Sequence, residues 1–276
     1  MMNIQRFAAF SDGDTGGNPA GVVIADAMPV AATMQAIAAE VGYSETVFAV
    51  PAGKGWRVRY FAPEVEVPFC GHATIALGAA LAQKVGDGVF ALQLNDSAIT
   101  VEGRRSGRLV EASLQSPPTR SEAAASGIVD EALSLFSLSP DELDPSLPVG
   151  IANAGINHLV LSLKTRRLLS AMRYDLEAGR EFMTRECIGT ISLVFAETRR
   201  LFHARNPFAV GGVYEDPATG AAAAALGGYL RDLDWPHEGA IDIVQGEDMG
   251  MRSRLHVQIP PELGSSIRVS GAARPL

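Results

Sequence analysis

Three short stretches of the chain place a proton-carrying side chain among small or turn-forming residues. Glu45 lies within Ser-Glu-Thr, His72 follows Cys70 and Gly71, and Asp216 begins the run Asp-Pro-Ala-Thr-Gly. Carboxylates and imidazoles are the groups that most often accept and donate protons in enzymes. The residue types therefore indicate acid–base chemistry, with Glu45 as the candidate proton carrier.

The surroundings of Glu45 favour a functional side chain on a firm scaffold. Apolar residues at helical spacing over 34–41 predict a helix that Gly42 ends, and residues 47–50 are typical of a strand. Glu45 thus lies where a helix gives way to a strand, a place that often carries functional side chains. The alternative, an ordinary solvated carboxylate at a strand end, stays open on the residues alone.

Residues 221–230 predict a buried helix, because five alanines and two leucines leave it apolar almost all round. Asp216 is expected to cap this helix, with Pro217 at its first position. Backbone N–H groups at a helix start lack partners within the helix and attract anions. Three residues are therefore candidate ligands of a carboxylate: Thr219, Gly220 and Ala221. On the alternative interpretation, Asp216 is a helix cap and nothing more.

The same arrangement occurs earlier in the chain. Residues 73–81 and 222–230 share Ala, Ala, Leu, Gly and Leu at an offset of 149, and Gly71 then falls opposite Gly220. A strand-like Arg-x-Phe precedes each segment. The pattern predicts two homologous halves, residues 1–118 and 119–264, with the tail 265–276 as a candidate addition to the first. Gly71 and Ala73 become the counterparts of the anion-binding residues above.

Composition narrows the class of protein. With 47% hydrophobic and 20% charged residues, the 276-residue chain is globular rather than disordered. The net charge of −8 and the lack of a basic cluster exclude nucleic acid as an expected partner. No apolar stretch is long enough for a membrane span, and the N-terminus lacks the features of a signal peptide, so we expect a cytoplasmic protein with no membrane partner.

The two cysteines, Cys70 and Cys187, have neither the spacing of a metal site nor the density of a disulfide framework. No metal and no cofactor are therefore expected. Cys70 is expected to be a small apolar neighbour at a helix start.

Several segments together resemble the PhzF-like proteins, the phenazine-biosynthesis isomerase and its relatives. They span residues 4–257 in the family's order: Gly17-Asn18-Pro19-Ala20, Ser44-Glu45-Thr46, Cys70-Gly71-His72-Ala73-Thr74, Glu215-Asp216-Pro217-Ala218-Thr219-Gly220, and Gln245-Gly246 with Met249-Gly250. The resemblance implies an α+β protein of the diaminopimelate-epimerase-like fold. In that fold each of two homologous halves wraps a strongly curved β-sheet around a central apolar α-helix, with the active site in the cleft between them.

The resemblance also implies roles for single residues. The family's proton-shuttling glutamate corresponds to Glu45, and its supporting histidine and aspartate correspond to His72 and Asp216. Asn18 is a candidate substrate contact as well, although its place in a Gly-Gly-Asn-Pro turn favours a structural role. The family often has a serine where this chain has Ala221, so a hydroxyl group is missing here.

Three functions remain open. The first is a cofactor-independent isomerase that moves a proton between carbons of a small cyclic or unsaturated carboxylate, with Glu45 as the acid/base. The second is an amino-acid racemase or epimerase. Racemases and epimerases of this fold use two opposed thiols, one at the start of each central helix. Cys70 stands at the start of one such helix, but residues 216–221, before the other, contain no cysteine. The third is a non-catalytic protein that keeps the cleft for binding. In each case the expected partner is a small-molecule carboxylate, and the expected assembly is a homodimer.

Overall fold

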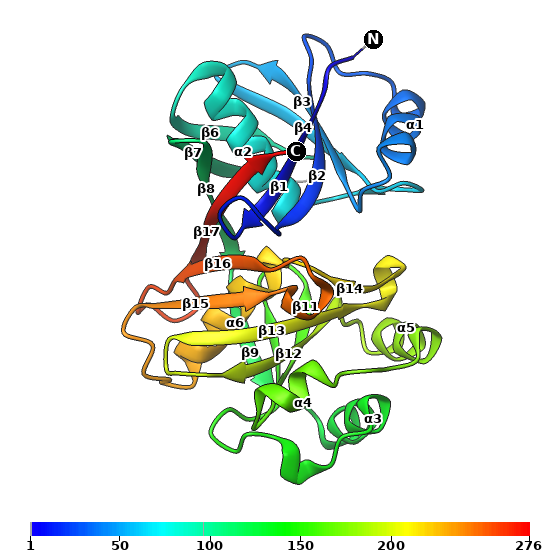
Figure 1. Ribbon diagram of the computed structural model, residues 1–276, viewed down its shortest axis with the longest axis vertical. Coiled ribbons are helices and arrows are strands. Elements are labelled where there is room, and N and C mark those ends of the chain that lie inside the picture. The colour runs from blue at the N-terminus through cyan, green and yellow to red at the C-terminus, as the bar shows by residue number, and fades with distance from the viewer. Residues whose placement is uncertain (1, 96) are drawn as a thin grey trace. The chain divides into compact units, whose positions relative to one another are not determined.

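A computed structural model describes residues 2–95 and 97–276 and places them in a mixed α+β arrangement (Figure 1). The helices are α1 (Ala31–Val41), α2 (Gly71–Val85), α3 (Ser126–Phe136), α4 (Arg166–Ser170), α5 (Leu176–Arg185) and α6 (Gly220–Asp232), with short 3₁₀ turns η1 (Pro140–Glu142), η2 (Ala209–Gly211) and η3 (Glu247–Met249). The strands of the N-terminal part are β1 (Ile4–Ser11), β2 (Asn18–Ile24), β3 (Thr46–Ala52), β4 (Gly55–Phe61), β5 (Glu66–Val67), β6 (Gly88–Gln93), β7 (Ala98–Ser106) and β8 (Leu109–Pro118). They are followed by β9 (Arg120–Ala123), β10 (Gly150–Asn153), β11 (Asn157–Ser162), β12 (Thr190–Ala196), β13 (Leu201–Phe208), β14 (Val213–Asp216), β15 (Ala240–Gln245), β16 (Ser253–Gln258) and β17 (Ser266–Pro275).

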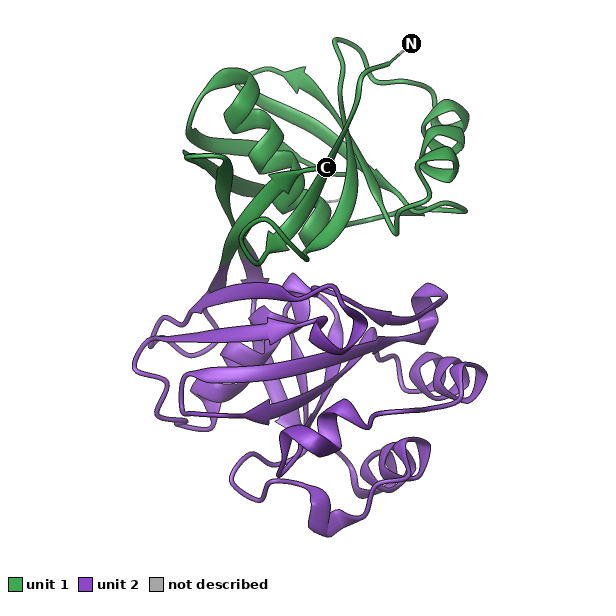
Figure 2. Ribbon diagram, viewed as in Figure 1, with its two compact units in different colours: residues 1–115, 270–276 green, residues 116–269 purple. Residues whose placement is uncertain are grey.

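The chain forms two compact units (Figure 2). Unit 1 comprises Met1–Gln115 with Ser270–Leu276, and unit 2 comprises Ser116–Val269. The division falls inside β8 and β17, so both strands contribute residues to each unit. Pro117 and Pro118, which stand at the expected boundary between the halves, are the last residues of β8, and β9 follows almost at once.

In unit 1 a closed ring of strands surrounds α2. Along the ring β1 pairs with β2, β2 with β3, β3 with β4, β4 with β6, β6 with β7, β7 with β8, β8 with β17, and β17 with β1. Every residue of α2 from His72 to Ala82 is buried, which is the expected state of a helix that is apolar all round. The curved sheet around a central helix is thus confirmed here.

Unit 2 builds the same kind of layer around α6, whose residues Ala222–Arg231 are all buried. Its sheet runs from β9 through β10, β11, β12, β13 and β15 to β16. The opposite face of the sheet carries a second core, in which Leu159, Leu161 and Leu193 pack with Phe136 of α3 and Phe182 of α5. The α+β class predicted from the sequence is confirmed.

The two units repeat one topology. Each unit begins with a hairpin, β1–β2 in unit 1 and β10–β11 in unit 2, and helical residues connect it to a second hairpin, β3–β4 or β12–β13. A short strand, β5 or β14, and then the central helix follow. The unit ends in a third hairpin, β6–β7 or β15–β16. The copies match in register at the short strands and the central helices, whereas β4 and β13 are shifted: the partners Tyr60 and Asn206 differ by 146 and not by 149. Arg59 therefore corresponds to Arg205, and not to the Arg200 of the Arg-x-Phe pattern. Tyr60 pairs with Val67 three residues before Cys70, as Asn206 pairs with Asp216 three residues before Thr219. Both central helices begin at the glycines that the offset of 149 relates, Gly71 and Gly220.

Among the residues described, no helix has the length and hydropathy to cross a membrane.

Candidate functional site

Glu45 lies at the predicted junction between a helix and a strand. Helix α1 ends at Val41, Gly42 closes it in the left-handed conformation with φ 70°, and β3 begins at Thr46. The side chain of Glu45 is only 12% exposed. Its Oε2 atom is buried and receives no hydrogen bond from the residues described. The simple interpretation of Glu45 as a solvated strand-end carboxylate is therefore wrong.

The start of α2 is held by a chain of buried hydroxyl groups. The carbonyl of Cys70, the N-cap residue, accepts from the Thr74 N–H at 3.0 Å and from Thr74 Oγ1 at 2.7 Å. Thr74 Oγ1 in turn lies 2.7 Å from the hydroxyl of Tyr60 on β4. Burial raises the pKa of Tyr60, so its hydroxyl stays protonated and can donate to Thr74. These bonds fix the N-cap residue against the sheet.

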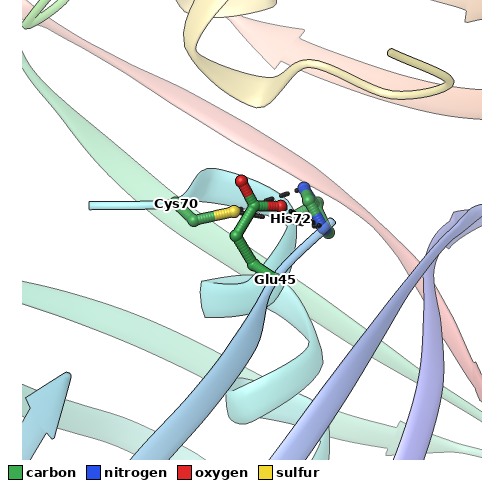
Figure 3. A group of neighbouring side chains, drawn as sticks. All are labelled: Glu45, Cys70 and His72. Atoms are coloured by element: carbon green, nitrogen blue, oxygen red, sulfur yellow. Dashed lines mark hydrogen bonds and ion pairs between the residues drawn. The ribbon is translucent and has the colours of Figure 1, made fainter. Parts of the chain in front are cut away.

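Three titratable groups meet at this helix start (Figure 3). His72 Nε2 lies 3.4 Å from Glu45 Oε2, and Cys70 Sγ lies 3.3 Å from His72 Nδ1. Ser44 Oγ lies 3.3 Å from His72 Nε2. Cys70 and His72 are 8% and 5% exposed. Cys70 is buried at the helix start, as expected of a small apolar neighbour, and its sulfur in addition contacts the imidazole.

The first turn of α2 also offers backbone donors. The N–H groups of Gly71, His72 and Ala73 precede the first intrahelical hydrogen bond, made by Thr74. Among the described residues no side chain caps the N-terminus of α2. A carboxylate placed here would meet donors and the positive end of the helix dipole.

Asp216 belongs to a second constellation, in unit 2. Its Oδ2 accepts from Thr219 Oγ1 at 2.6 Å, and its backbone carbonyl accepts from Gln245 Nε2 at 2.7 Å. Gln245 Nε2 also lies 3.0 Å from Thr219 Oγ1, and Gln245 Oε1 accepts from the Thr219 N–H at 3.1 Å. That N–H, a candidate ligand donor in the sequence, already has an acceptor, which leaves the N–H groups of Gly220 and Ala221 in this turn.

The predicted capping role of Asp216 is wrong. Helix α6 begins at Gly220 with Thr219 as N-cap residue, and Asp216 is the last residue of β14. The reason lies in Pro217, which pushes the preceding residue into the extended conformation that pairing with Asn206 also requires. Pro217 accordingly precedes the helix instead of opening it.

Two supporting residues had no role assigned from the sequence. Gln245, which is 1% exposed, ties the end of β14 to the start of α6. Arg205 forms a bidentate ion pair with Glu215, the neighbour of Asp216, at 3.0 and 2.5 Å, and it donates to the carbonyls of residues 169, 170 and 172. Gln245 stands in the Gln-Gly motif and Glu215 in the motif before α6, so both had a signal in the sequence, whereas Arg205 had none.

The remaining candidate, Asn18, is the first residue of β2 and is 2% exposed. It pairs with Ala9 of β1. This position in the ring gives it a structural function whether or not it touches a ligand.

Comparison with known proteins agrees with the fold. The chain is 33% identical to an uncharacterised isomerase of Deinococcus radiodurans, over 94% of this chain and 87% of the relative. It is 30% identical to the trans-2,3-dihydro-3-hydroxyanthranilate isomerase of Pseudomonas aeruginosa, over 95% and 93%.

Solved structures show the same architecture. A phenazine biosynthesis protein of the PhzF family from Bacillus anthracis superimposes with a TM-score of 0.87 at 22% identity, covering 100% of this chain and 97% of that one. A probable proline racemase from Agrobacterium radiobacter follows with a TM-score of 0.68 at 9% identity, covering 100% and 91%.

The sequence profile described as "PhzC-PhzF: Phenazine biosynthesis-like protein" matches residues 7–276. The curated relatives that span almost the whole chain are named isomerases, and this protein is an enzyme of that kind. From residue 7 to its last residue, the chain belongs to the PhzC-PhzF family of phenazine biosynthesis-like proteins.

Proposed function

We propose that this protein is a cofactor-independent isomerase that moves a proton between carbons of a small cyclic or unsaturated carboxylate, with Glu45 as general acid/base. One observation carries the proposal: the Glu45 carboxylate is nearly buried, and its Oε2 has an imidazole 3.4 Å away but no hydrogen-bond donor. A carboxylate in this state is poised to take a proton from a bound molecule.

His72 and the start of α2 complete the proposed machinery. His72 orients Glu45 or the substrate, and its backbone N–H stands with those of Gly71 and Ala73 at the positive end of the helix. These donors bind the substrate carboxylate and stabilise the negative charge that develops when a carbon loses its proton. Asp216 corresponds to the supporting aspartate of the family, and we assign it a supporting role in the reaction; within unit 2 it is held by Thr219 and Gln245.

The relative that acts on trans-2,3-dihydro-3-hydroxyanthranilate suggests the substrate class. That compound is a cyclic unsaturated carboxylate, so we extend the class, and not the compound, to this protein. Ala221 lacks the hydroxyl of the serine that is common in the family, and a substrate without a partner for that hydroxyl suits this chain better.

Exchange of carbon-bound hydrogen with solvent deuterium tests the proposal. In D₂O the protein should incorporate deuterium into a cyclic unsaturated carboxylate, as followed by NMR or mass spectrometry. Glu45→Gln keeps the size of the side chain but removes its titratable proton, and we expect exchange to fall ~100-fold or more. Glu40→Gln, on the exposed side of α1, is the matched control and should exchange normally. Undiminished exchange by folded Glu45→Gln would refute the role of Glu45.

A racemase or epimerase is the second candidate, and the contact between Cys70 Sγ and His72 Nδ1 favours it. A thiol next to an imidazole can supply the second acid/base that inversion at one carbon needs. Under the isomerase proposal Cys70→Ala keeps most of the exchange activity. Complete loss of exchange in a folded Cys70→Ala protein, with amino-acid carboxylates as the substrates exchanged by wild type, would instead establish thiol chemistry.

A further inference from the structure

Glu45, Cys70 and His72 present three different ligand atoms to one point. A carboxylate oxygen, a sulfur and an imidazole nitrogen all lie within 4.8 Å of one another (Figure 3). The three side chains come from the turn before β3, the N-cap of α2 and its first turn, and each is at least seven-eighths buried. The residues form one unit of structure, because all three lie in unit 1.

We propose that these three residues form a binding site for Zn²⁺, which inhibits the enzyme by occupying its proton-transfer groups. Thiolate, imidazole and carboxylate are the ligands that zinc takes in proteins. Tetrahedral coordination at the usual bond lengths separates neighbouring ligand atoms by about 3.3–3.6 Å. His72 Nε2 lies 3.4 Å from Glu45 Oε2 and 4.0 Å from Cys70 Sγ, so small side-chain rotations bring the set to that geometry.

Two further features point to a cation. Glu45 Oε2 is buried and accepts no hydrogen bond from the described part of the chain, and its neighbour at 3.4 Å, the His72 imidazole, is a charge partner only when protonated. A bound cation would supply a positive charge here while the imidazole stays neutral. The charges also balance, because a carboxylate and a thiolate together neutralise one divalent ion in a site from which water is largely excluded. Sulfur and nitrogen ligands select zinc over magnesium or calcium, which bind oxygen.

Binding exchanges one ion for one proton. The Cys70 thiol loses its proton to solvent, a bond forms between sulfur and zinc, and no electrons are transferred. Affinity should therefore increase with pH. Three protein ligands leave the fourth position to water, as in open zinc sites. The inhibitory part of the inference rests on the proposed role of Glu45, whereas the binding part does not.

Cobalt titration of the metal-free protein tests binding directly. Co²⁺ substitutes for zinc, and its bond to a thiolate absorbs in the near-ultraviolet. We expect this absorption to saturate at one ion per chain and to disappear when Zn²⁺ is added. Cys70→Ser should abolish it, and Glu45→Gln should weaken binding ~10-fold or more. Cys187→Ser removes the exposed second cysteine and is the matched control, which should bind normally.

A second measurement needs no change in the site itself. Cys187→Ser leaves Cys70 as the only thiol of the chain. Zn²⁺ should slow the reaction of this thiol with a disulfide reagent at least ~10-fold, and a chelator should restore the rate. Absence of both the cobalt–thiolate absorption and this protection overturns the metal site, with the isomerase proposal unaffected. Tight binding of zinc without loss of isomerase activity overturns the inhibition, and the role of Glu45 with it.

Discussion

At the scale of single residues, His158 is the most unusual group outside the candidate site. Its side chain is fully buried in unit 2, with Nδ1 2.7 Å from Thr190 Oγ1 and with Nε2 unpartnered among the residues described. Burial lowers the pKa of His158 from 6.5 to about 3. The folded protein therefore keeps this imidazole neutral at a pH where the unfolded chain protonates it.

Linkage turns this pKa into a dependence of stability on pH. The contribution of His158 is fully present above pH 6.5 and is lost as the pH falls toward 3, by about 1.4 kcal/mol for each pH unit. Between pH 8 and pH 5, His158→Asn should lose about 2 kcal/mol less of the free energy of unfolding than wild type does. Urea denaturation at both pH values measures the difference. An equal slope in His158→Asn would contradict the prediction.

The sequence predicted single residues best where they stand at a junction of elements. The place of Glu45 followed from the helix signal before it and the strand signal after it. The contact of Cys70 with His72 did not, because it depends on side-chain directions at the first turn of a helix. The spacing of the two cysteines likewise says nothing about ligand atoms that three separate elements bring together.

At the scale of elements, each central helix packs closely against a strand at a glycine, and the two glycines occupy equivalent positions in the repeat. A Cβ atom on Gly78 of α2 would lie 2.6 Å from Val101 Cγ2, and one on Gly227 of α6 would lie 2.8 Å from Val257 Cγ1. The offset of 149 relates the two glycines, so the repeat extends to how closely helix and sheet approach.

Gly78→Ala and Gly227→Ala should each lower the free energy of unfolding by about 1–3 kcal/mol through overpacking. Overpacking outweighs the gain of up to ~1 kcal/mol in helix propensity. Gly127→Ala in α3 is the control, because its Cβ meets nothing within 4 Å, and it should be neutral or stabilising. Thermal or urea denaturation of the three variants measures these differences in stability. If Gly78→Ala and Gly227→Ala are as stable as Gly127→Ala, the overpacking prediction is wrong.

Gln245 joins two elements, β14 and α6, through three hydrogen bonds. Gln245→Leu leaves the buried N–H of Thr219 and the carbonyl of Asp216 without these hydrogen-bond partners, so the free energy of unfolding should fall by about 1–3 kcal/mol. Gln258→Leu, exposed on β16, should change it little. Denaturant titration compares the two. Isomerase activity of Gln245→Leu should fall more than that of the equally destabilised Gly227→Ala if Gln245 positions Asp216; equal losses would leave it a stability residue alone.

The central helices and most strands could be predicted from hydrophobic periodicity, because each pattern is local. The strand character of Pro117 and Pro118 could not, since proline normally argues against a strand. These prolines end β8, where a missing N–H costs least. The extended conformation of Asp216 likewise came from the following proline and from pairing with a strand distant in sequence.

At the scale of the whole molecule, the two ends of the chain meet in one ring. Pro275, Arg274 and Ala273 of β17 pair with Phe7, Ala8 and Ala9 of β1, and the Leu276 N–H donates to the Arg6 carbonyl at 2.9 Å. Closure of the ring around α2 therefore needs pairing between residues 7–9 and residues 273–275, a contact that no local pattern in the sequence reveals.

Deletion of residues 270–276 should open this ring and destabilise unit 1 strongly. It removes the β17 residues that pair with β1, among them the buried Ala273, and leaves that edge of β1 unpaired. We expect loss of the cooperative unfolding transition or aggregation, as seen by circular dichroism and size-exclusion chromatography. Removal of Leu276 alone, a half-exposed residue, should have little effect. A truncated protein as stable as the full chain would show that the ring is dispensable.

The repeated topology also bears on descent. It implies that a stretch covering about half of the gene was copied in tandem, after which strand order persisted while matched side chains diverged. The first copy has His72 where the second has Ala221, and the second has Asp216 where the first has Val67. A protein built from two copies of unit 1 would lack the counterpart of Asp216, and one built from two copies of unit 2 would lack the counterpart of His72. Under the proposed function, which assigns a role to both His72 and Asp216, neither copy could replace the other, and the two copies could no longer be separated without loss of activity.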